Sequence, residues 1–519
     1  MRLHDFLDFH AREQPDADFA VQGGSSVSYG DALREIHRIA NALIRSGVGP
    51  GERVAILSKN CIEYALFYYA ASKAGVVPVP LNYRLAPPEW RTIAQDAAPK
   101  LLLARGELVG AIDAICGELP SLAQRVALGA PAPAGWTRFE DWTRGAAETP
   151  PAREVASGDD LYQMYTSGTT GRPKGAVLTH AAISAQLEQV SGVLHVAPGD
   201  RYLIVAPVFH AAGALAAFWT IRQGGTLFIM EDFDPSAVVK ALSEEGIAAA
   251  SLVPAMIQAC LVAVPDAATR CYDSLRFVLY GASPIAAETL RRAFDVFRCG
   301  FAQGYGMTEM TAGATFLLPR EHERALGDAP ALLLSCGRPL PGTEVRVVDP
   351  EGRDLPPGET GEILLRGPQM MRGYWNLPDA TAEALAGGWM HTGDAGALDD
   401  EGFLYIQDRV KDMIVSGAEN VYPREVENAL FEHPAVADAA VIGVPDARWG
   451  EVVKALVVLR KGAAASEGEL IEFCRGRLAG FKRPRSVEFV ADLPRNPSGK
   501  VLKKDLREKY WKGHTRRVG

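Results

Sequence analysis

Residues 165–175 read Tyr-Thr-Ser-Gly-Thr-Thr-Gly-Arg-Pro-Lys-Gly. The stretch lies between an apolar run at residues 161–165, expected to be a strand, and a helix expected to begin near His180. Its hydroxyls, its exposed backbone N–H groups and Lys174 together form a nest suited to a polyphosphate. A Walker loop needs its Lys directly after Gly and before Ser or Thr, whereas Lys174 lies between Pro173 and Gly175. The stretch therefore predicts a phosphate-binding loop of a different type. The alternative, a flexible Ser/Gly linker, would not need the order Pro-Lys-Gly.

Helices and strands alternate on both sides of this stretch. A helical stripe from Leu33 to Ile44 stops at Gly47, and a short buried strand is expected at residues 53–57. Further strands are expected at 202–205, 248–253 and 275–280, with a helix at 236–245. Such alternation predicts parallel sheets covered by helices.

In the last third of the chain, turn residues are more closely spaced. After Leu340 turn residues come every few positions, which predicts a small, mostly antiparallel β subdomain. A charged connector at 408–411 then leads into a compact α+β region. We therefore predict an α/β protein with a large N-terminal domain at residues 1–408, a hinge at 409–411 and a small C-terminal domain at 412–519.

Composition argues against several classes of protein. The net charge of -9 disfavours nucleic acid as the main partner. The seven cysteines are scattered without a Cys-x-x-Cys pair, which favours free thiols over disulfides or a zinc site. The N-terminus has acids where a secretory signal needs apolar residues, and no apolar run is uninterrupted enough to span a bilayer. We expect a cytoplasmic protein with no integral membrane segment.

The C-terminus is basic although the protein is acidic. Residues 475–519 contain 14 Lys and Arg against 4 Asp and Glu. This excess predicts either a solvated basic surface or a site for a polyanionic cofactor, and composition leaves both open.

Four further motifs accompany the phosphate stretch. They are Gln-Gly-Tyr-Gly-Met-Thr-Glu at 303–309, Trp-Met-His-Thr-Gly-Asp at 389–394, the segment 408–427, and Pro-Arg-Asn-Pro-Ser-Gly-Lys at 494–500. In this order they resemble the adenylate-forming superfamily of acyl-CoA synthetases, amino-acid adenylation domains and luciferases, and especially its bacterial fatty-acyl and aryl-acyl-CoA synthetases. The resemblance implies that a carboxylic acid and ATP form an acyl-adenylate with release of pyrophosphate, and that the acyl group then passes to CoA.

The resemblance assigns the groups that act on the phosphates. Lys500 would bridge the acid's carboxylate and the α-phosphate, because an anion attacking an anionic phosphate needs positive charge. Thr308 would place a hydroxyl on the α-phosphate, while Glu309 and Thr166 would bind Mg²⁺.

The same resemblance places the nucleoside. Tyr305 would lay its ring on adenine, Gly281, Ala282 and Ser283 would form a wall beside it, and Asp394 and Arg409 would bind the ribose hydroxyls. The full set expected to contact ATP or AMP is Thr166, Ser167, Gly168, Thr169, Thr170, Gly171, Lys174, Gly281, Ala282, Ser283, Gln303, Gly304, Tyr305, Gly306, Thr308, Asp394, Arg409 and Lys500.

The acyl pocket is expected around His210. A lone His after an apolar strand is more often structural, but the family has this residue beside the acyl carboxylate, so His210 is predicted to be catalytic together with Lys500, Glu309 and Thr308. The predicted lining is His210, Ala211, Val253, Gly281, Gly304, Met307 and Gly313. This lining offers no acidic residue for an ammonium group, which disfavours amino acids and leaves open a medium or long fatty acid or a bulky cyclic or aryl acid.

Transfer to CoA is expected to involve the small domain. In the family this domain is mobile and rotates about a residue that corresponds to Lys411. Rotation would bring Gly417 and Ala418 to the pantetheine arm, although a strand bulge is the alternative for Gly417. The predicted CoA contacts are Gly417, Ala418, Phe481, Arg483 and Arg485.

Three alternatives stay open in different degrees. A ligase that delivers its adenylate to a carrier-protein thiol shares the whole first half-reaction. A non-catalytic nucleotide-binding protein is disfavoured because Thr166, Glu309 and Lys500 are all present, and a P-loop kinase is disfavoured by the spacing around Lys174. The predicted cofactors are thus ATP, Mg²⁺ and CoA, the predicted partner is a small carboxylic acid, and a homodimer is left open.

Overall fold

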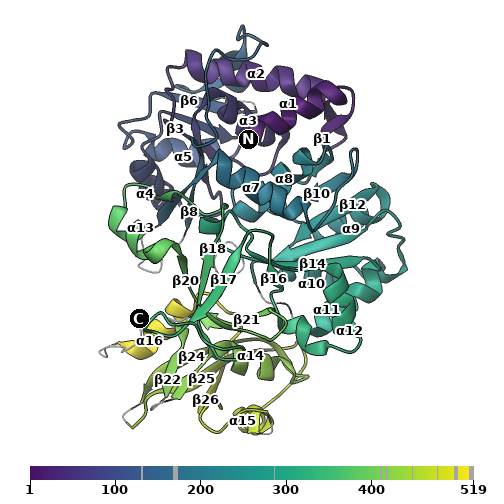
Figure 1. The fold of residues 1–519 in the computed structure, drawn as a ribbon, viewed down its shortest axis with the longest axis vertical. Helices are drawn as coiled ribbons and strands as arrows, with labels where there is room; N and C mark the ends of the chain where they lie inside the picture. The colour runs from purple at the N-terminus through teal and green to yellow at the C-terminus, as the bar shows by residue number, and fades with distance from the viewer. Residues whose placement is uncertain are drawn as a thin grey trace.

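A nine-stranded sheet forms the centre of the large domain in the computed structural model (Figure 1). The structure describes residues 1–129, 132–166, 173–283, 285, 287–409, 412–416, 419–446, 448–475, 477–495 and 501–512, without the side chains of 408, 409, 419 and 420. In spatial order the strands are β16 (Arg338–Pro339), β15 (Thr315–Leu317), β14 (Gly300–Tyr305), β13 (Phe277–Gly281), β12 (Ile247–Leu252), β10 (Arg201–Ile204), β11 (Thr226–Ile229), β1 (Asp18–Gln22) and β2 (Ser25–Ser28). All pairs from β14 to β1 are parallel.

A second parallel sheet lies beside the first. Its order is β4 (Val77–Leu81), β3 (Arg53–Leu57), β5 (Leu101–Arg105), β6 (Gln124–Leu128) and β7 (Thr137–Arg138). Every residue of β3 and β4 is buried, as expected for parallel strands covered on both faces. The two sheets confirm the predicted α/β class.

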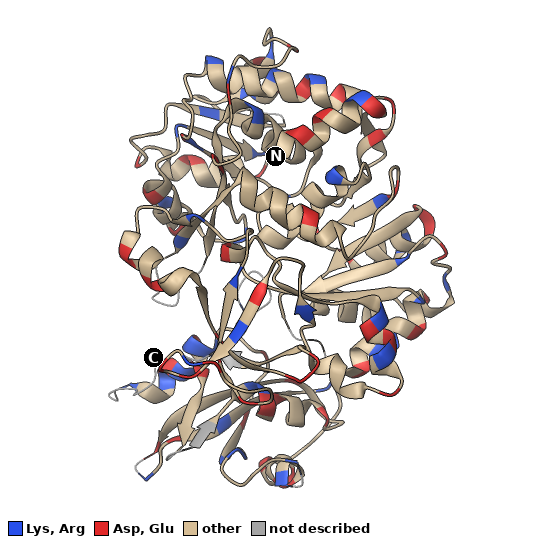
Figure 2. Cartoon of the chain, in the orientation of Figure 1, with Lys and Arg blue, Asp and Glu red and all other residues tan. Residues whose placement is uncertain are grey.

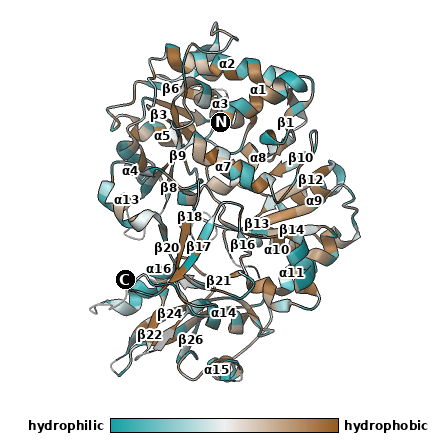
Figure 3. Ribbon diagram, in the orientation of Figure 1, coloured by the Kyte–Doolittle hydropathy of each residue, from teal (hydrophilic) through white to brown (hydrophobic). Residues whose placement is uncertain are grey.

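Helices cover the faces of both sheets, and the apolar residues concentrate inside (Figure 3). Local signals set their ends: Ser28 accepts a hydrogen bond from Asp31 N at the start of α2, and α3 ends at Gly75 in the left-handed conformation. The helices of the large domain are α1 (Leu3–Glu13), α2 (Tyr29–Arg45), α3 (Ile62–Ala74), α4 (Pro87–Ala97), α5 (Leu108–Cys116), α6 (Phe139–Thr143), α7 (His180–Ser191), α8 (Ala211–Arg222), α9 (Pro235–Glu244), α10 (Pro254–Ala263), α11 (Ala287–Phe297), α12 (Pro319–Leu326) and α13 (Pro378–Ala384). Short 3-10 turns are η1 (Ala267–Thr269), η2 (Thr308–Met310), η3 (Pro330–Leu334) and η4 (Ala386–Gly388).

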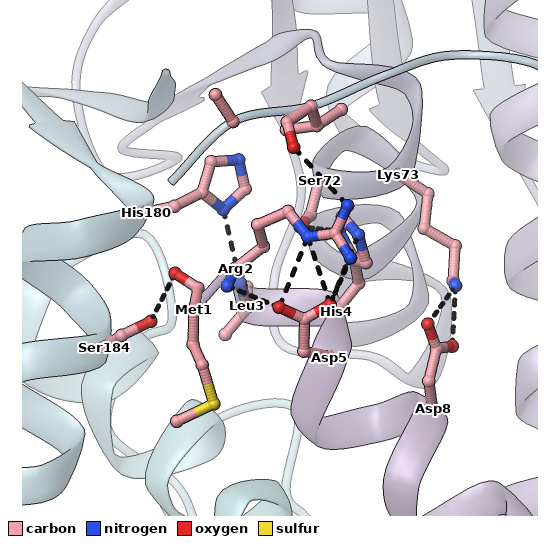
Figure 4. Close-up of polar contacts among 12 residues, drawn as sticks. Met1, Arg2, Leu3, His4, Asp5, Asp8, Ser72, Lys73, His180 and Ser184 are labelled. Carbon is pink, nitrogen blue, oxygen red and sulfur yellow. Dashed lines mark hydrogen bonds and ion pairs between the residues drawn. The ribbon is translucent and has the colours of Figure 1, made fainter. Parts of the chain in front are cut away.

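Buried polar contacts attach the N-terminal helix α1 to its neighbours α3 and α7 (Figure 4). The backbone N–H of Leu3 donates to Nδ1 of His180 at 3.2 Å, and Nδ1 of His4 lies 2.8 Å from the hydroxyl of Ser72 on α3. His180 is the first residue of α7 and is 1% exposed. The helix therefore begins where it was predicted, and its first residue serves packing.

Two antiparallel sheets complete the large domain. The first has the order β19 (Gly373–Tyr374), β9 (Lys174–Thr179) and β8 (Asp160–Thr166). The second has the order β17 (Glu344–Val348), β18 (Gly361–Arg366), β20 (Met390–Leu398) and β21 (Leu404–Arg409), which confirms the predicted β subdomain. Strand β21 pairs as far as Arg409, whereas the predicted hinge residue Lys411 lies outside the described residues.

The C-terminal region forms its own α+β layer at the bottom of Figure 1. Its strands are β23 (Glu419–Val421), β22 (Ile414–Ser416), β25 (Gly450–Leu459) and β24 (Val436–Asp446) in spatial order, with β26 (Ser486–Phe489) parallel to β25. Its helices are α14 (Pro423–Phe431), α15 (Glu467–Arg475) and α16 (Lys503–Trp511). In the part of the chain that the structure describes, no helix combines the length and apolar character needed to cross a bilayer.

Candidate active site

The phosphate stretch joins two strands of a β-hairpin. Thr166 at the end of β8 pairs directly with Lys174 at the start of β9, and α7 begins only at His180, after β9. The expectation of a strand-to-helix loop is therefore wrong, because β9 lies between the loop and the helix. Ser167, Gly168, Thr169, Thr170 and Gly171 lie outside the described residues.

A buried polar network fixes the base of this hairpin. Arg53 Nε donates to Oε1 of Gln163 at 3.0 Å, Gln163 Nε2 donates to the hydroxyl of Tyr165 at 2.8 Å, and that hydroxyl donates to Asp96 at 2.5 Å. A Cβ atom at Gly175 would lie only 2.7 Å from Gln163 Nε2, so this glycine is required by the close packing. The network holds Thr166 and Lys174 in one place relative to the large domain.

Glu309 lies next to this hairpin. It belongs to the 3-10 turn η2, which begins at Thr308, and it is 5% exposed. Its Oε1 atom accepts a hydrogen bond from the hydroxyl of Tyr374 at 2.8 Å and lies 3.4 Å from Oγ1 of Thr166. The structure thus brings together Thr166 and Glu309, the two residues predicted to bind Mg²⁺.

This pair of ligands fits Mg²⁺. Both hydrogen bonds of the Glu309 carboxylate within the described residues reach Oε1. One carboxylate and one hydroxyl, completed by phosphate oxygens and water, are the hard oxygen ligands that Mg²⁺ prefers. Among the described residues, no group of three or more His, Cys, Asp or Glu forms a separate metal cage.

The predicted nucleoside residues converge from two sheets. The hydroxyl of Tyr305, the last residue of β14, donates to Oδ2 of Asp394 on β20 at 2.9 Å. Asp394 is the direct cross-strand partner of Arg409, whose side chain lies outside the described atoms. Burial raises the pKa of the Tyr305 phenol, so this hydroxyl stays protonated and can donate.

Close backbone packing shapes the wall predicted beside adenine. Gly281 is the parallel-sheet partner of Gly304, and a Cβ atom at Gly281 would lie 2.3 Å from the Gly304 carbonyl oxygen. Ala282, the next residue, has a φ of 65°, in the left-handed region that costs a non-glycine residue energy. Ser283 follows it, and Gln303 is buried on β14.

The carboxyl ends of four neighbouring parallel strands carry the predicted residues. His210 follows β10, Val253 follows β12, Gly281 to Ser283 end β13, and Gly304 to Thr308 end β14. In open α/β sheets such an edge is where ligands bind. The fold therefore gathers the predicted acyl and nucleotide residues along one edge.

His210 is a half-buried imidazole that is neutral at pH 7. It precedes α8, and its Nε2 atom is buried without a hydrogen-bond partner among the described residues. Burial, assisted by the positive charge of Arg84, lowers the pKa of His210 to about 4. A neutral ring at pH 7 can therefore donate or accept one hydrogen bond at Nε2 without bringing a charge.

Two of the glycines predicted to line the acyl pocket lie close to a phenylalanine. A Cβ atom at Gly304 would lie 3.1 Å from the ring of Phe316, its partner on β15, and one at Gly313 would lie 3.2 Å from the same ring. Phe316 is 6% exposed. Part of the space left by these glycines is thus filled by Phe316, a residue that the sequence did not single out.

The predicted CoA residues Phe481, Arg483 and Arg485 lie directly before β26 in the small domain. The backbone N–H of Arg485 donates to the Val453 carbonyl at 2.7 Å, and Phe481 packs against the apolar core of this domain. On α16, whose basic residues are blue in Figure 2, Lys503, Arg507 and Lys509 form ion pairs with Glu427, Asp412 and Glu488. Within the described residues, neither Arg483 nor Arg485 forms an ion pair, which keeps both available for an anionic ligand.

An exposed tryptophan near Arg485 was missed from the sequence. Trp449 is 40% exposed at the turn between β24 and β25, where its ring is 4.8 Å from the guanidinium of Arg448. Asp446 accepts the backbone N–H groups of Arg448 and Trp449, and its pKa is lowered by these hydrogen bonds and by the nearby charge of Arg485. The sequence signal that could have identified Trp449 is a Trp close in the chain to a turn aspartate.

Three predicted residues of the C-terminal region lie outside the described residues. Arg495 and Val501 pair as an isolated bridge, and Lys500 lies between them outside the described residues. Gly417 and Ala418 also lie outside them, between β22 and β23.

The AMP-binding enzyme family matches residues 7–375, and the AMP-binding enzyme C-terminal domain family matches residues 425–500. A feruloyl-CoA synthase of Amycolatopsis sp is 41% identical over 96% of this chain and 97% of its own length. The fatty acid–[acyl-carrier-protein] ligase ScoC of Streptomyces coeruleorubidus is 39% identical over 98% and 96%. The ATP-bound structure of MatB from Rhodopseudomonas palustris superposes with a TM-score of 0.89 at 31% identity, over 99% of this chain and 100% of that one.

Proposed function

The chain belongs to the AMP-binding enzyme family, and from this membership we propose that it is an ATP-dependent acyl-CoA synthetase, an acid–thiol ligase that releases AMP and pyrophosphate. One observation carries the proposal: Thr166 of the phosphate hairpin meets Glu309, at the edge where four parallel strands end. That edge also carries Tyr305, which is bonded to Asp394.

The first half-reaction joins the acid to AMP. An oxygen of the substrate carboxylate attacks the α-phosphorus of ATP, the bond from that phosphorus to the bridging oxygen breaks, and pyrophosphate leaves. Lys174 and Lys500 would supply positive charge, and the hydroxyl of Thr308 would donate to the α-phosphate. Glu309 and Thr166 would hold Mg²⁺, which supplies neutralisation of phosphate charge when bound.

The nucleoside would be held by the pair formed by Tyr305 and Asp394. The tyrosine ring would lie against adenine, while Asp394 accepts from a ribose hydroxyl and the strand partner Arg409 donates to another. His210 would meet the acid's carboxylate through its buried Nε2 atom. Because this ring is neutral at pH 7, it can orient the carboxylate without neutralising its negative charge.

The second half-reaction moves the acyl group to a thiol. The sulfur of CoA attacks the acyl carbon, the bond from that carbon to the AMP oxygen breaks, and the thiol proton passes to solvent. The guanidinium groups of Arg483 and Arg485, which form no ion pair within the described residues, would pair with the phosphates of CoA, and the exposed ring of Trp449 would offer a stacking surface. The small domain would turn about Lys411 to bring Gly417 and Ala418 to the pantetheine arm.

The acid is proposed to be apolar. Ala211, Val253 and Met307 offer no charge to a second polar group of the substrate, and Phe316 closes one side of the pocket with an aromatic ring. A medium or long fatty acid and a bulky aryl or cyclic acid both fit this chemistry, and one relative named for each kind of acid covers nearly the whole chain. The cysteines within the described residues are free thiols, which supports a cytoplasmic enzyme.

Transfer to a carrier-protein thiol is the second candidate, because ScoC is named for that acceptor. A panel of fatty and aryl acids, incubated with ATP and Mg²⁺, tests both. We expect acid-dependent release of pyrophosphate and, with free CoA, an acyl-CoA of the expected mass. Thioester formed only on a phosphopantetheinylated carrier protein would favour the second candidate, and release of ADP would contradict both.

A further inference from the structure

Tyr374 contacts both charged groups that flank the phosphate stretch. Its hydroxyl donates to Oε1 of Glu309 at 2.8 Å. Its ring receives the ammonium nitrogen of Lys174, which lies 4.9 Å from the ring centroid. The two contacts come from different parts of one half-buried side chain, so they can be separated by substitution.

The backbone holds this side chain in place. Tyr374 is the strand partner of Ala176, and the neighbouring Trp375 N–H donates to the Gly175 carbonyl at 2.8 Å. On the other side, the Met371 N–H donates to the carbonyl of Glu309, also at 2.8 Å. The segment 371–375 is therefore attached both to the phosphate hairpin and to the turn that carries Glu309.

We propose that Tyr374 is a positioning residue for adenylation, which orients the Glu309 carboxylate for Mg²⁺ and keeps the Lys174 ammonium apart from that carboxylate. The inference rests on the proposed function, since it assigns Glu309 to the metal and Lys174 to the phosphates. In this role Tyr374 acts through Glu309 and Lys174, the two groups that it contacts.

The hydroxyl acts on the metal ligand. A carboxylate that receives one fixed hydrogen bond on Oε1 has its side-chain orientation set, and its second oxygen is left for a cation. Groups that orient a metal ligand in this way typically contribute about 10- to 100-fold to metal affinity.

The ring acts on the lysine. Within the described residues Lys174 forms no ion pair with Glu309, and its ammonium nitrogen lies over the Tyr374 ring, 4.9 Å from the centroid. The π face of Tyr374 instead attracts the ammonium by its quadrupole. Lys174 thus keeps a place beside the phosphate stretch until a phosphate anion, which attracts it more strongly, arrives.

Two substitutions separate these roles in the full-length protein. Tyr374→Phe removes the hydroxyl and keeps the ring, whereas Tyr374→Leu removes both. The measurement is binding of α,β-methylene-ATP, which cannot release pyrophosphate, by calorimetry at a series of Mg²⁺ concentrations and without metal. For Tyr374→Phe we expect the half-saturating Mg²⁺ concentration to rise about 10- to 100-fold, with nucleotide binding in the absence of metal unchanged. For Tyr374→Leu we expect the half-saturating Mg²⁺ concentration to rise and nucleotide binding without metal to weaken as well.

Tyr272→Phe is the matched control. This tyrosine is buried, and its hydroxyl donates to the Ala267 carbonyl, far along the chain from Tyr374 and Glu309. It should leave the Mg²⁺ dependence unchanged.

Two outcomes would overturn the inference. Tyr374→Phe could match wild type and the control in its Mg²⁺ dependence, which would leave the hydroxyl without a role at the metal. It could instead weaken metal-free and metal-loaded binding by the same factor, which would show a purely structural role. A wild-type protein that binds nucleotide but releases no pyrophosphate with any acid would contradict the proposed function, whereas a normal wild type with an unaffected Tyr374→Phe contradicts the inference alone.

Discussion

The hydroxyl of Tyr305 donates to the carboxylate of Asp394 at 2.9 Å, although 89 residues separate the two in the chain. Tyr305 ends the parallel strand β14, and Asp394 lies on β20 of the antiparallel subdomain. The bond therefore connects the two sheets at the point where the nucleoside is proposed to bind. A base stacked on Tyr305 would place its ribose beside Asp394.

Asp394→Ala should weaken binding of ATP through its ribose. Loss of a hydrogen bond to a charged group is expected to raise KM for ATP about tenfold or more, with KM for the acid little changed. The measurement is acid-dependent pyrophosphate release with ATP and with 2′-deoxy-ATP and 3′-deoxy-ATP. Wild type should discriminate against one deoxy nucleotide, and the variant should not. Equal discrimination by both proteins would show that Asp394 does not bind the ribose.

Lys500→Ala should separate the two half-reactions. Without this cation the attack on the α-phosphate should slow by at least about 10²- to 10³-fold, as for loss of a transition-state donor. Acyl-adenylate made chemically should still react with CoA at close to the wild-type rate. If both half-reactions fell by the same factor, the assignment of Lys500 to adenylation would be wrong.

Charge reversal at Arg483 and Arg485 should affect only the second half-reaction. Glu at both positions should raise KM for CoA about tenfold or more, because two charge-assisted hydrogen bonds to phosphate are replaced by repulsion. Pyrophosphate release without CoA should be unchanged. Arg475→Glu is the control, since Arg475 is exposed and already paired with Glu472. A rise in KM for ATP in the double variant would point to a nucleotide site instead.

Buried histidines should make the protein sensitive to acid. Burial lowers the pKa of His4 to about 3 and the pKa values of His180 and His322 to about 4, all below the ordinary value of 6.5. Between pH 6.5 and 4 the unfolded chain binds protons that the folded protein does not, so the free energy of unfolding falls as pH falls. As the pH falls from 7 to 5.5, each such histidine should lower the free energy of unfolding by about 1 kcal/mol.

Urea unfolding at several pH values measures this slope. His322→Gln should reduce the slope of the free energy of unfolding against pH by the contribution of one proton. Substitution of the exposed His195 by Gln should leave this slope unchanged. A free energy of unfolding that stays constant or rises from pH 7 to 5.5 would contradict the burial of neutral histidines.

The sequence predicted the parts of the fold that local patterns determine. Strands such as Arg53–Leu57 and the helix that begins at His180 follow from hydrophobic runs and helix-start signals, and both occur as expected. The antiparallel subdomain followed from its dense turn residues. The strand at 174–179 was missed because its apolar residues directly follow the Pro-Lys-Gly of the phosphate stretch and precede a helix without an intervening turn.

The site was predicted where motifs carry the chemistry and missed where contacts depend on tertiary pairing. Thr166 and Glu309 were assigned to one metal, and the structure places them 3.4 Å apart. No local pattern brings Tyr374 to Glu309, since that contact depends on the pairing of β19 with β9. Likewise, only the register of β15 shows that Phe316 lies against the predicted pocket glycines at 304 and 313.

The central claim is that the acid's own carboxylate attacks the α-phosphorus of ATP before any thiol takes part. An acid labelled with ¹⁸O in both carboxylate oxygens tests this most directly, in a complete reaction with ATP, Mg²⁺ and CoA followed by mass spectrometry of AMP, pyrophosphate and acyl-CoA. The account predicts AMP that carries one ¹⁸O, unlabelled pyrophosphate, and acyl-CoA that keeps the other ¹⁸O. Unlabelled AMP, or ADP together with labelled inorganic phosphate, would contradict it.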